Sequence, residues 1–246
     1  MKFEKLALIG CGLMGGSFAL ALKKAGLVNQ VVGFSASEGT RQRALELGVI
    51  DVIAPSAAQA VQDADLVLVA VPVSATQATF AAIAPTLSAQ TLLMDVGSTK
   101  CDVVAAAMAT LGERLPCFVP AHPIAGKEVA GVEHADAELY HNRQLILTPL
   151  PCNGLRKITQ AHHVWEALGS QVITLTPEEH DATFAAVSHL PHLVAFALVN
   201  AVAKQPHGAD HLSMAGPGFR DFSRIAASDP AVWLSLIHIS EPTRPY

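Results

Sequence analysis

A glycine-rich turn near the N-terminus has the spacing of a dinucleotide-binding site. Its three glycines form the pattern G-x-G-x-x-G between an apolar run at residues 6–9 and a helical repeat. The first glycine permits a tight turn, the second lets the backbone approach a pyrophosphate, and the third lets the helix pack close to the strand. The pyrophosphate would lie at the helix N-terminus, where N–H groups and the helix dipole attract an anion. The residues predicted to contact the cofactor here are Gly10, Gly12, Leu13, Met14 and Gly15.

The residues after the second predicted strand bear on which cofactor binds. In NAD-binding turns an acidic residue at this point receives the ribose 2′-hydroxyl, whereas NADP-binding turns lack the acid and have an arginine nearby. Ser35 stands in the place of the acid, and Ser37, Thr40, Arg41 and Arg43 follow it. Hydroxyls and a guanidinium suit a 2′-phosphate, because charge-assisted contacts are stronger than neutral ones. We therefore favour NADP over NAD. In the alternative interpretation Ser37 is only an N-cap and the arginines belong to a solvated helix face.

Three polar segments lie where a substrate would bind. They are residues 95–100 (DVGSTK), 121–128 (AHPIAGKE) and 188–192 (SHLPH). The first two follow predicted strands, and ligands of open α/β sheets bind beyond the carboxyl ends of the strands. His122 has an ordinary pKa of about 6.5, so it is neutral and basic near pH 7 and can accept a proton. A histidine before a proline at a strand end could equally cap a turn.

Composition excludes several other classes of protein. The 246-residue chain is 51% hydrophobic and 15% charged, and its formal net charge of −5 argues against broad binding to nucleic acid or an anionic membrane. Two long uncharged stretches, residues 66–94 and 182–203, contain prolines and polar residues that argue against membrane spans. The N-terminus does not resemble a signal peptide, and the four cysteines form no C-x-x-C pair. We expect a cytoplasmic protein.

Strands alternate with helices over the first 175 residues, which predicts a parallel sheet. Strands are expected at residues 6–9, 30–34, 66–71, 92–96 and 117–121, with two more at 144–148 and 171–175 along one edge. Helices are expected to follow the glycine turn and to cover residues 37–47, 57–64, 74–87 and 99–111. The predicted fold class is α/β, with a Rossmann-like NAD(P)-binding domain at residues 1–175.

The pattern changes at residue 176. Thr176 can act as an N-cap, Pro177 suits the first turn, and two glutamates then face the helix dipole. A long apolar helix should run to about residue 203, and no strand pattern follows it. We expect an all-helical second domain at residues 176–234, with a tight loop at residues 216–218.

The chain resembles the prephenate and arogenate dehydrogenases of tyrosine biosynthesis over roughly residues 5–234. The motifs that carry the resemblance are GCGLMGGS at 10–17, DVGSTK at 95–100, HPIAGKEVAGVE at 122–133, SHLPH at 188–192 and GPGFRDFSRIAASDPAVW at 216–233. The resemblance implies an oxidative decarboxylation of a cyclohexadienyl substrate. A ring C–H leaves as hydride to the nicotinamide, carbon dioxide departs and the ring becomes aromatic. Prephenate would give 4-hydroxyphenylpyruvate, and arogenate would give tyrosine.

The resemblance also implies roles for individual residues. His122 matches the catalytic histidine of the family, which accepts a hydrogen bond or proton from the ring hydroxyl. Ser98 would hydrogen-bond near that hydroxyl, unless it only caps the helix expected from about residue 99. The expected substrate-binding residues are Glu128, His189, His192 and Arg224.

Each of these assignments has an alternative. Glu128 could be a solvated loop acid. Arg224, or the weaker candidate Arg220, could form a structural ion pair with a nearby aspartate. His189 and His192 are three residues apart, which raises the question of a metal site. Without a third ligand such as His180 we expect no metal.

Two other functions fit parts of the sequence. A β-hydroxyacid type of dehydrogenase would use a catalytic lysine, Lys100 or Lys127, in place of His122. A non-catalytic NAD(P)-sensing domain would give no role to the segments around His122 and Arg224. The resembling family forms homodimers, but residues 235–246 depart from its pattern. We expect them to be a non-native tail on a truncated second domain, which makes dimerisation doubtful.

Overall fold

The computed structural model describes residues 2–227 and divides into two compact units, Met1–His180 and Asp181–Tyr246. The first unit combines parallel strands with helices, and the described part of the second is helical. The predicted α/β fold class with a Rossmann-like domain followed by helices is therefore confirmed. The predicted tail at residues 235–246 lies outside the described residues.

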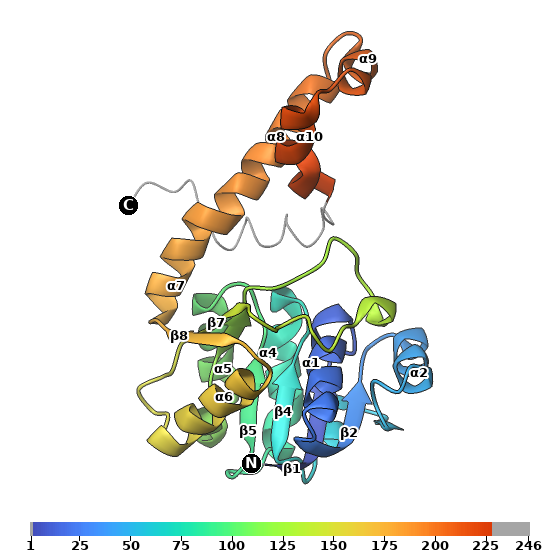
Figure 1. The fold of residues 1–246 in the computed structure, drawn as a ribbon. Helices are drawn as coiled ribbons and strands as arrows, with labels where there is room; N and C mark the ends of the chain where they lie inside the picture. The colour runs from blue at the N-terminus through green and yellow to red at the C-terminus, as the bar shows by residue number, and fades with distance from the viewer. Residues whose placement is uncertain (1, 228–246) are drawn as a thin grey trace. The chain divides into compact units, whose positions relative to one another are not determined.

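Five parallel strands form the main sheet, in the order β3-β2-β1-β4-β5 (Figure 1). The strands are β1 (Phe3–Ile9), β2 (Val28–Phe34), β3 (Val52–Ile53), β4 (Leu66–Val69) and β5 (Leu92–Asp95). The α-helices of this unit are α1 (Leu13–Lys24), α2 (Glu38–Glu46), α3 (Ala57–Val61), α4 (Val73–Ile83), α5 (Cys101–Thr110) and α6 (Leu155–Ala167). Short 3₁₀ turns are η1 (Ala84–Thr86), η2 (Gly112–Cys117) and η3 (Val132–His134). The strand order reverses between β1 and β4, which is where sheets of this type bind ligands.

The central strand β1 is buried on both faces. Leu6 and Leu8 belong to the hydrophobic core that contains Trp165 of α6, whereas Ala7 belongs to the core that contains Phe80 of α4. Successive side chains of a strand point to opposite faces. Burial on both faces therefore explains why β1 is a continuous apolar run rather than an alternating one.

Three later strands form a separate sheet rather than an edge of the main one. They are β6 (Ala121–Pro123), β7 (Gln144–Leu147) and β8 (Gln171–Thr174). β6 runs antiparallel to β7, and β7 runs parallel to β8. The chain returns from β6 through a loop without a crossover helix, and such a return gives antiparallel pairing. The prediction that residues 144–148 and 171–175 extend the parallel sheet was wrong for this reason.

The strand predicted at residues 117–121 is also misplaced. Phe118 makes only an isolated bridge to Leu93, and β6 begins at residue 121. The Asn153 amide group donates a hydrogen bond to the Phe118 carbonyl oxygen at 2.8 Å. A side chain therefore satisfies a backbone group that a strand would have paired with a neighbour.

The second unit continues the helix that starts after β8. Its elements are α7 (Pro177–Phe184), a π turn η4 (Ala185–His189), α8 (Leu190–Ala203), α9 (Gly208–Ser213), α10 (Pro217–Ser223) and η5 (Arg224–Ala227). The predicted uniform helix is interrupted at the π turn, just before Pro191, whose nitrogen cannot donate a helical hydrogen bond. The loop predicted at residues 216–218 instead starts α10, with Pro217 in the first turn.

One helical run of the described chain, Pro177–Ala203, is long and apolar enough to cross a membrane, with a mean hydropathy of 1.6. This finding rests on length and composition alone, and an apolar helix that packs against protein meets the same criterion.

The loop between β6 and β7 is attached to α1. The Tyr140 hydroxyl donates a hydrogen bond to the Met14 carbonyl oxygen at 2.6 Å, and the Asp136 N–H donates to Ser17 Oγ at 2.9 Å. Tyr140 is fully buried, burial raises its pKa, and its ring packs edge-on against Trp165. The far end of this loop is therefore held on the helix that follows the glycine turn.

We predict that Tyr140→Phe lowers the free energy of unfolding by about 1 kcal/mol, because it removes one buried hydrogen bond and keeps the aromatic packing. Urea denaturation of both proteins measures the difference. An unchanged free energy of unfolding would show that this bond does not hold the loop.

Candidate active site

The glycine turn lies at the carboxyl end of β1, beside β4. Gly10 has φ +98°, and a Cβ atom there would lie 2.3 Å from the Ala70 carbonyl oxygen. A Cβ at Gly15 would lie 2.1 Å from the Gly10 carbonyl oxygen. Among residues 2–227, its two chain neighbours aside, a Cβ at Gly12 would meet no atom within 4 Å. The first and third glycines are thus required by the fold, whereas the second leaves open space at the start of α1. These residues fit a pyrophosphate.

The side chains near the end of β2 are turned toward the glycine turn. Ser35 Oγ accepts a hydrogen bond from the Cys11 N–H at 2.7 Å. Arg41 donates to the Ser35 carbonyl oxygen at 3.0 Å, and its guanidinium lies 5.4 Å from the centroid of the Phe34 ring. Arg41 is therefore not simply part of a solvated face, and it lies where the ribose end of a dinucleotide would be.

Ser37 has the N-cap role that the sequence analysis gave as the alternative to cofactor binding. It is the N-cap of α2, and its hydroxyl accepts a hydrogen bond from the Thr40 N–H at 3.3 Å. Arg43 lies 3.1 Å from Glu46 and 3.7 Å from Glu133. The two arginines of α2 therefore differ in their surroundings.

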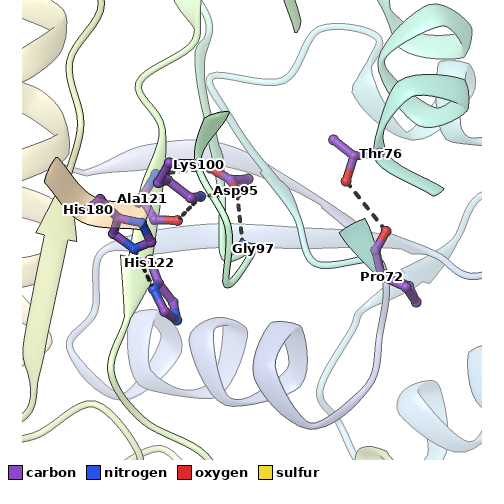
Figure 2. Close-up of polar contacts among 8 residues, drawn as sticks. All are labelled: Pro72, Thr76, Asp95, Gly97, Lys100, Ala121, His122 and His180. Atoms are coloured by element: carbon purple, nitrogen blue, oxygen red, sulfur yellow. Dashed lines mark hydrogen bonds and ion pairs between the residues drawn. The ribbon is translucent and has the colours of Figure 1, made fainter. Parts of the chain in front are cut away.

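Two charged side chains are buried together where β5 ends (Figure 2). Lys100 Nζ lies 2.5 Å from Asp95 Oδ2 and donates to the Ala121 carbonyl oxygen at 2.7 Å. The Asp95 carboxylate also accepts hydrogen bonds from the N–H groups of Ala121 at 2.9 Å and Gly97 at 2.8 Å. Both backbone groups of Ala121 are thus bonded to the ion pair. The position of the next residue, His122, is set by these contacts.

The two lysines of the alternative dehydrogenase function are both engaged within the fold. Lys100 is fully buried in its ion pair with Asp95. Lys127 donates hydrogen bonds to the His134 carbonyl oxygen and to Asp136, each at 3.0 Å. A catalytic lysine has to reach the substrate, so these contacts do not favour lysine-based chemistry.

His122 lies in β6 and is half-buried. Its Nδ1 lies 2.8 Å from Nε2 of His180, a fully buried residue in the first turns of α7 (Figure 2). The second ring nitrogen of His122 is Nε2. Because neutral imidazole accepts a proton at one nitrogen while the other carries hydrogen, this arrangement suits a general base.

Ser98 and Glu128 flank this centre in sequence. Ser98 is half-buried in the loop between β5 and α5, and α5 starts at Cys101 with Lys100 as its N-cap residue. Ser98 is therefore not the N-cap of that helix, and its substrate role stays a prediction. Glu128 is exposed in the loop after β6.

The remaining predicted substrate residues, His189, His192 and Arg224, belong to the second unit. His189 is buried in the π turn, and Arg224 is exposed at the start of η5. His192 Nδ1 donates a hydrogen bond to the Ser188 carbonyl oxygen at 2.9 Å. Burial lowers the pKa of His192, although the hydrogen bond to Ser188 opposes that effect. His192 is therefore neutral near pH 7 and would act as a hydrogen-bonding group rather than a cation.

Sequence reasoning missed three parts of this centre. Asp95 and Lys100 were seen only as members of a motif or as a possible catalytic lysine, and His180 only as a possible metal ligand. An aspartate at the end of a buried strand, five residues before a lysine, was the available signal for the ion pair. Within residues 2–227 no group of three metal-ligating side chains is found.

Comparison with known families covers almost the whole chain. Residues 18–174 match the model of the prephenate dehydrogenase nucleotide-binding domain, and residues 176–242 match that of the prephenate dehydrogenase dimerization domain.

Individual relatives give the same result. The chain is 35% identical to a cyclohexadienyl dehydrogenase of Zymomonas mobilis, over 98% of this chain and 82% of the relative. It is 36% identical to a prephenate dehydrogenase of Bacillus subtilis, over 95% of this chain but only 63% of the relative's length. A crystal structure of prephenate dehydrogenase from A. aeolicus, in complex with hydroxyphenyl propionate and NAD+, superposes with a TM-score of 0.90 at 35% identity, covering 98% of this chain and 84% of that one.

We predict that Gly12→Ala weakens binding of NAD(P) at least tenfold, because the new methyl group occupies the space where the backbone approaches the pyrophosphate. The free energy of unfolding should change by less than about 1 kcal/mol, since no clash with that methyl group is found in the described part of the chain. Fluorescence titration with reduced cofactor and urea denaturation measure the two effects. Gly15→Ala is the contrast, because its methyl group clashes with the backbone and should destabilise the fold itself. Unchanged affinity in Gly12→Ala would contradict this placement of the cofactor.

Proposed function

Because the chain belongs to the prephenate dehydrogenase family, we propose that it catalyses the oxidative decarboxylation of prephenate or arogenate with NAD(P). The family consists of nicotinamide-dependent oxidoreductases, and the first unit of this chain is the corresponding nucleotide-binding domain. The observation that carries the proposal is the placement of His122. It lies next to a buried ion pair at the end of β5, and its Nδ1 is paired with His180.

The residues of the chain have separate tasks in this reaction. His122 Nε2 accepts the hydrogen of the ring hydroxyl, and Ser98 hydrogen-bonds near the same group. The nicotinamide supplies the hydride acceptor when it is bound. As the ring C–H bond and the bond to the ring carboxylate break, carbon dioxide leaves and the ring becomes aromatic. Holding the hydroxyl against His122 supplies orientation, which is a large part of the catalytic effect in such sites.

The carboxylates of the substrate need a cationic partner. We assign this task to Arg224, whose planar guanidinium can bind a carboxylate through two hydrogen bonds. Arg220 is less suited, because its Nε already donates to the Ala215 carbonyl oxygen at 3.0 Å. We also propose that His192 and His189 bind the substrate and that Glu128 acts as a gating residue.

We propose NADP as the preferred cofactor. Ser35 replaces the acidic residue that would repel a 2′-phosphate, and the Arg41 guanidinium is held at the end of β2 by the Ser35 carbonyl oxygen. The A. aeolicus protein was crystallised with NAD+. Preference for NAD is therefore the alternative outcome when turnover is measured with both cofactors.

We further propose that the chain forms a homodimer through its second unit and acts in the cytoplasm. Residues 176–242 match a dimerization domain. Leu190 and Val194 are exposed on α8 four residues apart, which places them on one face, and Val187 is exposed in the π turn before α8. An apolar stripe of this kind is suited to burial against a second copy.

The proposed function is tested by following reduced-cofactor formation with prephenate and with arogenate, each with NADP and NAD. We predict that His122→Asn lowers kcat roughly 10²- to 10⁴-fold, the usual contribution of a general base, while cofactor affinity is retained. His163→Asn, an exposed histidine of α6, is the matched control. Full turnover by His122→Asn would overturn the assigned role, and no turnover by the unaltered chain with either substrate would overturn the proposed function.

The cofactor preference is tested by comparing the two arginines of α2. We predict that Arg41→Ala weakens NADP binding about 10- to 100-fold and NAD binding much less, because only NADP loses a charge-assisted contact. Arg43→Ala should leave both affinities nearly unchanged, since Arg43 pairs with Glu46 and Glu133. Equal losses for both cofactors in Arg41→Ala would show that Arg41 does not contact a 2′-phosphate.

A further inference from the structure

We infer that His180 is a positioning residue for His122, which it holds in the tautomer that can accept a proton from the substrate. His180 Nε2 accepts the hydrogen on His122 Nδ1, so that His122 Nε2 is unprotonated and faces the ring hydroxyl. This inference rests on the proposed function and adds a residue to which that function assigns no task.

The contact between the two rings is short and shielded. His122 Nδ1 and His180 Nε2 are 2.8 Å apart, a normal hydrogen-bond distance. The ring planes are inclined at 63° with centroids 5.0 Å apart, so the rings meet through nitrogen atoms rather than by stacking. The side chain of His180 is fully buried, and Figure 2 shows its ring next to the ring of His122.

The local fold places His180 at this point. β6, β7 and β8 are paired so that His122 lies opposite Ile146, and Ile146 opposite Ile173. Helix α7 starts three residues after β8 ends, and a capping box sets its first turn.

The capping box has both of its hydrogen bonds. The Glu179 N–H donates to Thr176 Oγ1 at 3.1 Å, and the Thr176 N–H donates to the Glu179 carboxylate at 2.9 Å. The His180 N–H then donates to the Thr176 carbonyl oxygen at 3.0 Å, which is the first bond of the helix. These hydrogen bonds therefore fix the backbone of His180 independently of the contact between its side chain and His122.

The chemistry selects one of two proton arrangements. Two neutral imidazoles at this distance share one hydrogen, which belongs either to His122 or to His180. If His180 were the donor, His122 would carry its own hydrogen on Nε2 and could not accept one from the substrate. With His122 as donor, Nε2 is basic, and the imidazolium formed after proton transfer keeps its hydrogen bond to His180.

His122 is thus restrained from two sides. The Asp95–Lys100 pair holds the Ala121 peptide unit that precedes it, and His180 holds its ring. Restraint of both backbone and ring leaves the imidazole few orientations. In sites of this kind small misplacements have large effects on rate.

The test compares two substitutions of His180. His180→Leu keeps a side chain of similar size without a polar atom, and we expect kcat to fall about 100-fold with little change in the KM for prephenate or in cofactor affinity. His180→Gln can place its amide oxygen near the position of Nε2, and it should recover most of that loss. His163→Leu, on the exposed face of α6, is the control.

The decisive measurement is the tautomer of His122 by ¹⁵N NMR of histidine-labelled protein. In the unaltered chain we expect His122 Nδ1 to carry the hydrogen, and in His180→Leu we expect a mixture of tautomers. Hydrogen on His122 Nε2 in the unaltered chain would overturn the inference, even if His180→Leu did not fold. A loss of kcat in His180→Leu with an unchanged His122 tautomer would overturn it as well. Absence of turnover by the unaltered chain would instead refute the proposed function, and the NMR result would still stand.

Discussion

At the end of β5, the Asp95 carboxylate and the Lys100 ammonium group are buried together and bonded to both sides of the Ala121 peptide unit. Buried charges are tolerated only when they are paired and their remaining hydrogen-bonding capacity is satisfied. Here the backbone of β6 supplies that satisfaction. The Asp95–Lys100 pair therefore joins the main parallel sheet to the second sheet, and it does so through hydrogen bonds to Ala121. His122 is the next residue of β6.

A second connection leads from His122 to the cofactor turn. The loop that follows β6 ends at Tyr140, whose hydroxyl is bonded to Met14 at the start of α1. Asp136 of the same loop is bonded to Ser17. The proposed general base and the proposed pyrophosphate site are thus tied to one packed framework. A hydride-transfer site requires such support, because its reacting groups must be held to within a few tenths of an ångström of the productive geometry.

A Rossmann-like sheet alone does not identify a reaction, since the same fold carries many chemistries. The distinction lies in the groups at the carboxyl ends of the strands. A lysine-based dehydrogenase is disfavoured because Lys100 is committed to Asp95 and Lys127 to the loop. A purely sensing domain would not need a paired histidine at His122. Family membership and the site geometry thus point to the same chemistry.

The sequence by itself determined the α/β class, the glycine turn and the helical second part, because these depend on local patterns. Gly10 and Gly15 show this, since Gly10 has φ +98° and a Cβ at Gly15 would lie 2.1 Å from the Gly10 carbonyl oxygen, and both constraints lie within the turn itself. Only the tertiary structure decided that residues 121–123, 144–147 and 171–174 form a separate sheet, because strand pairing depends on how the chain returns. It also decided the roles of Lys100 and His180. Lys100 pairs with Asp95 five residues away, and the only signal for that pair was an aspartate at a strand end before a lysine. His180 meets His122 across 58 residues, and no local pattern shows which distant group a buried side chain will meet.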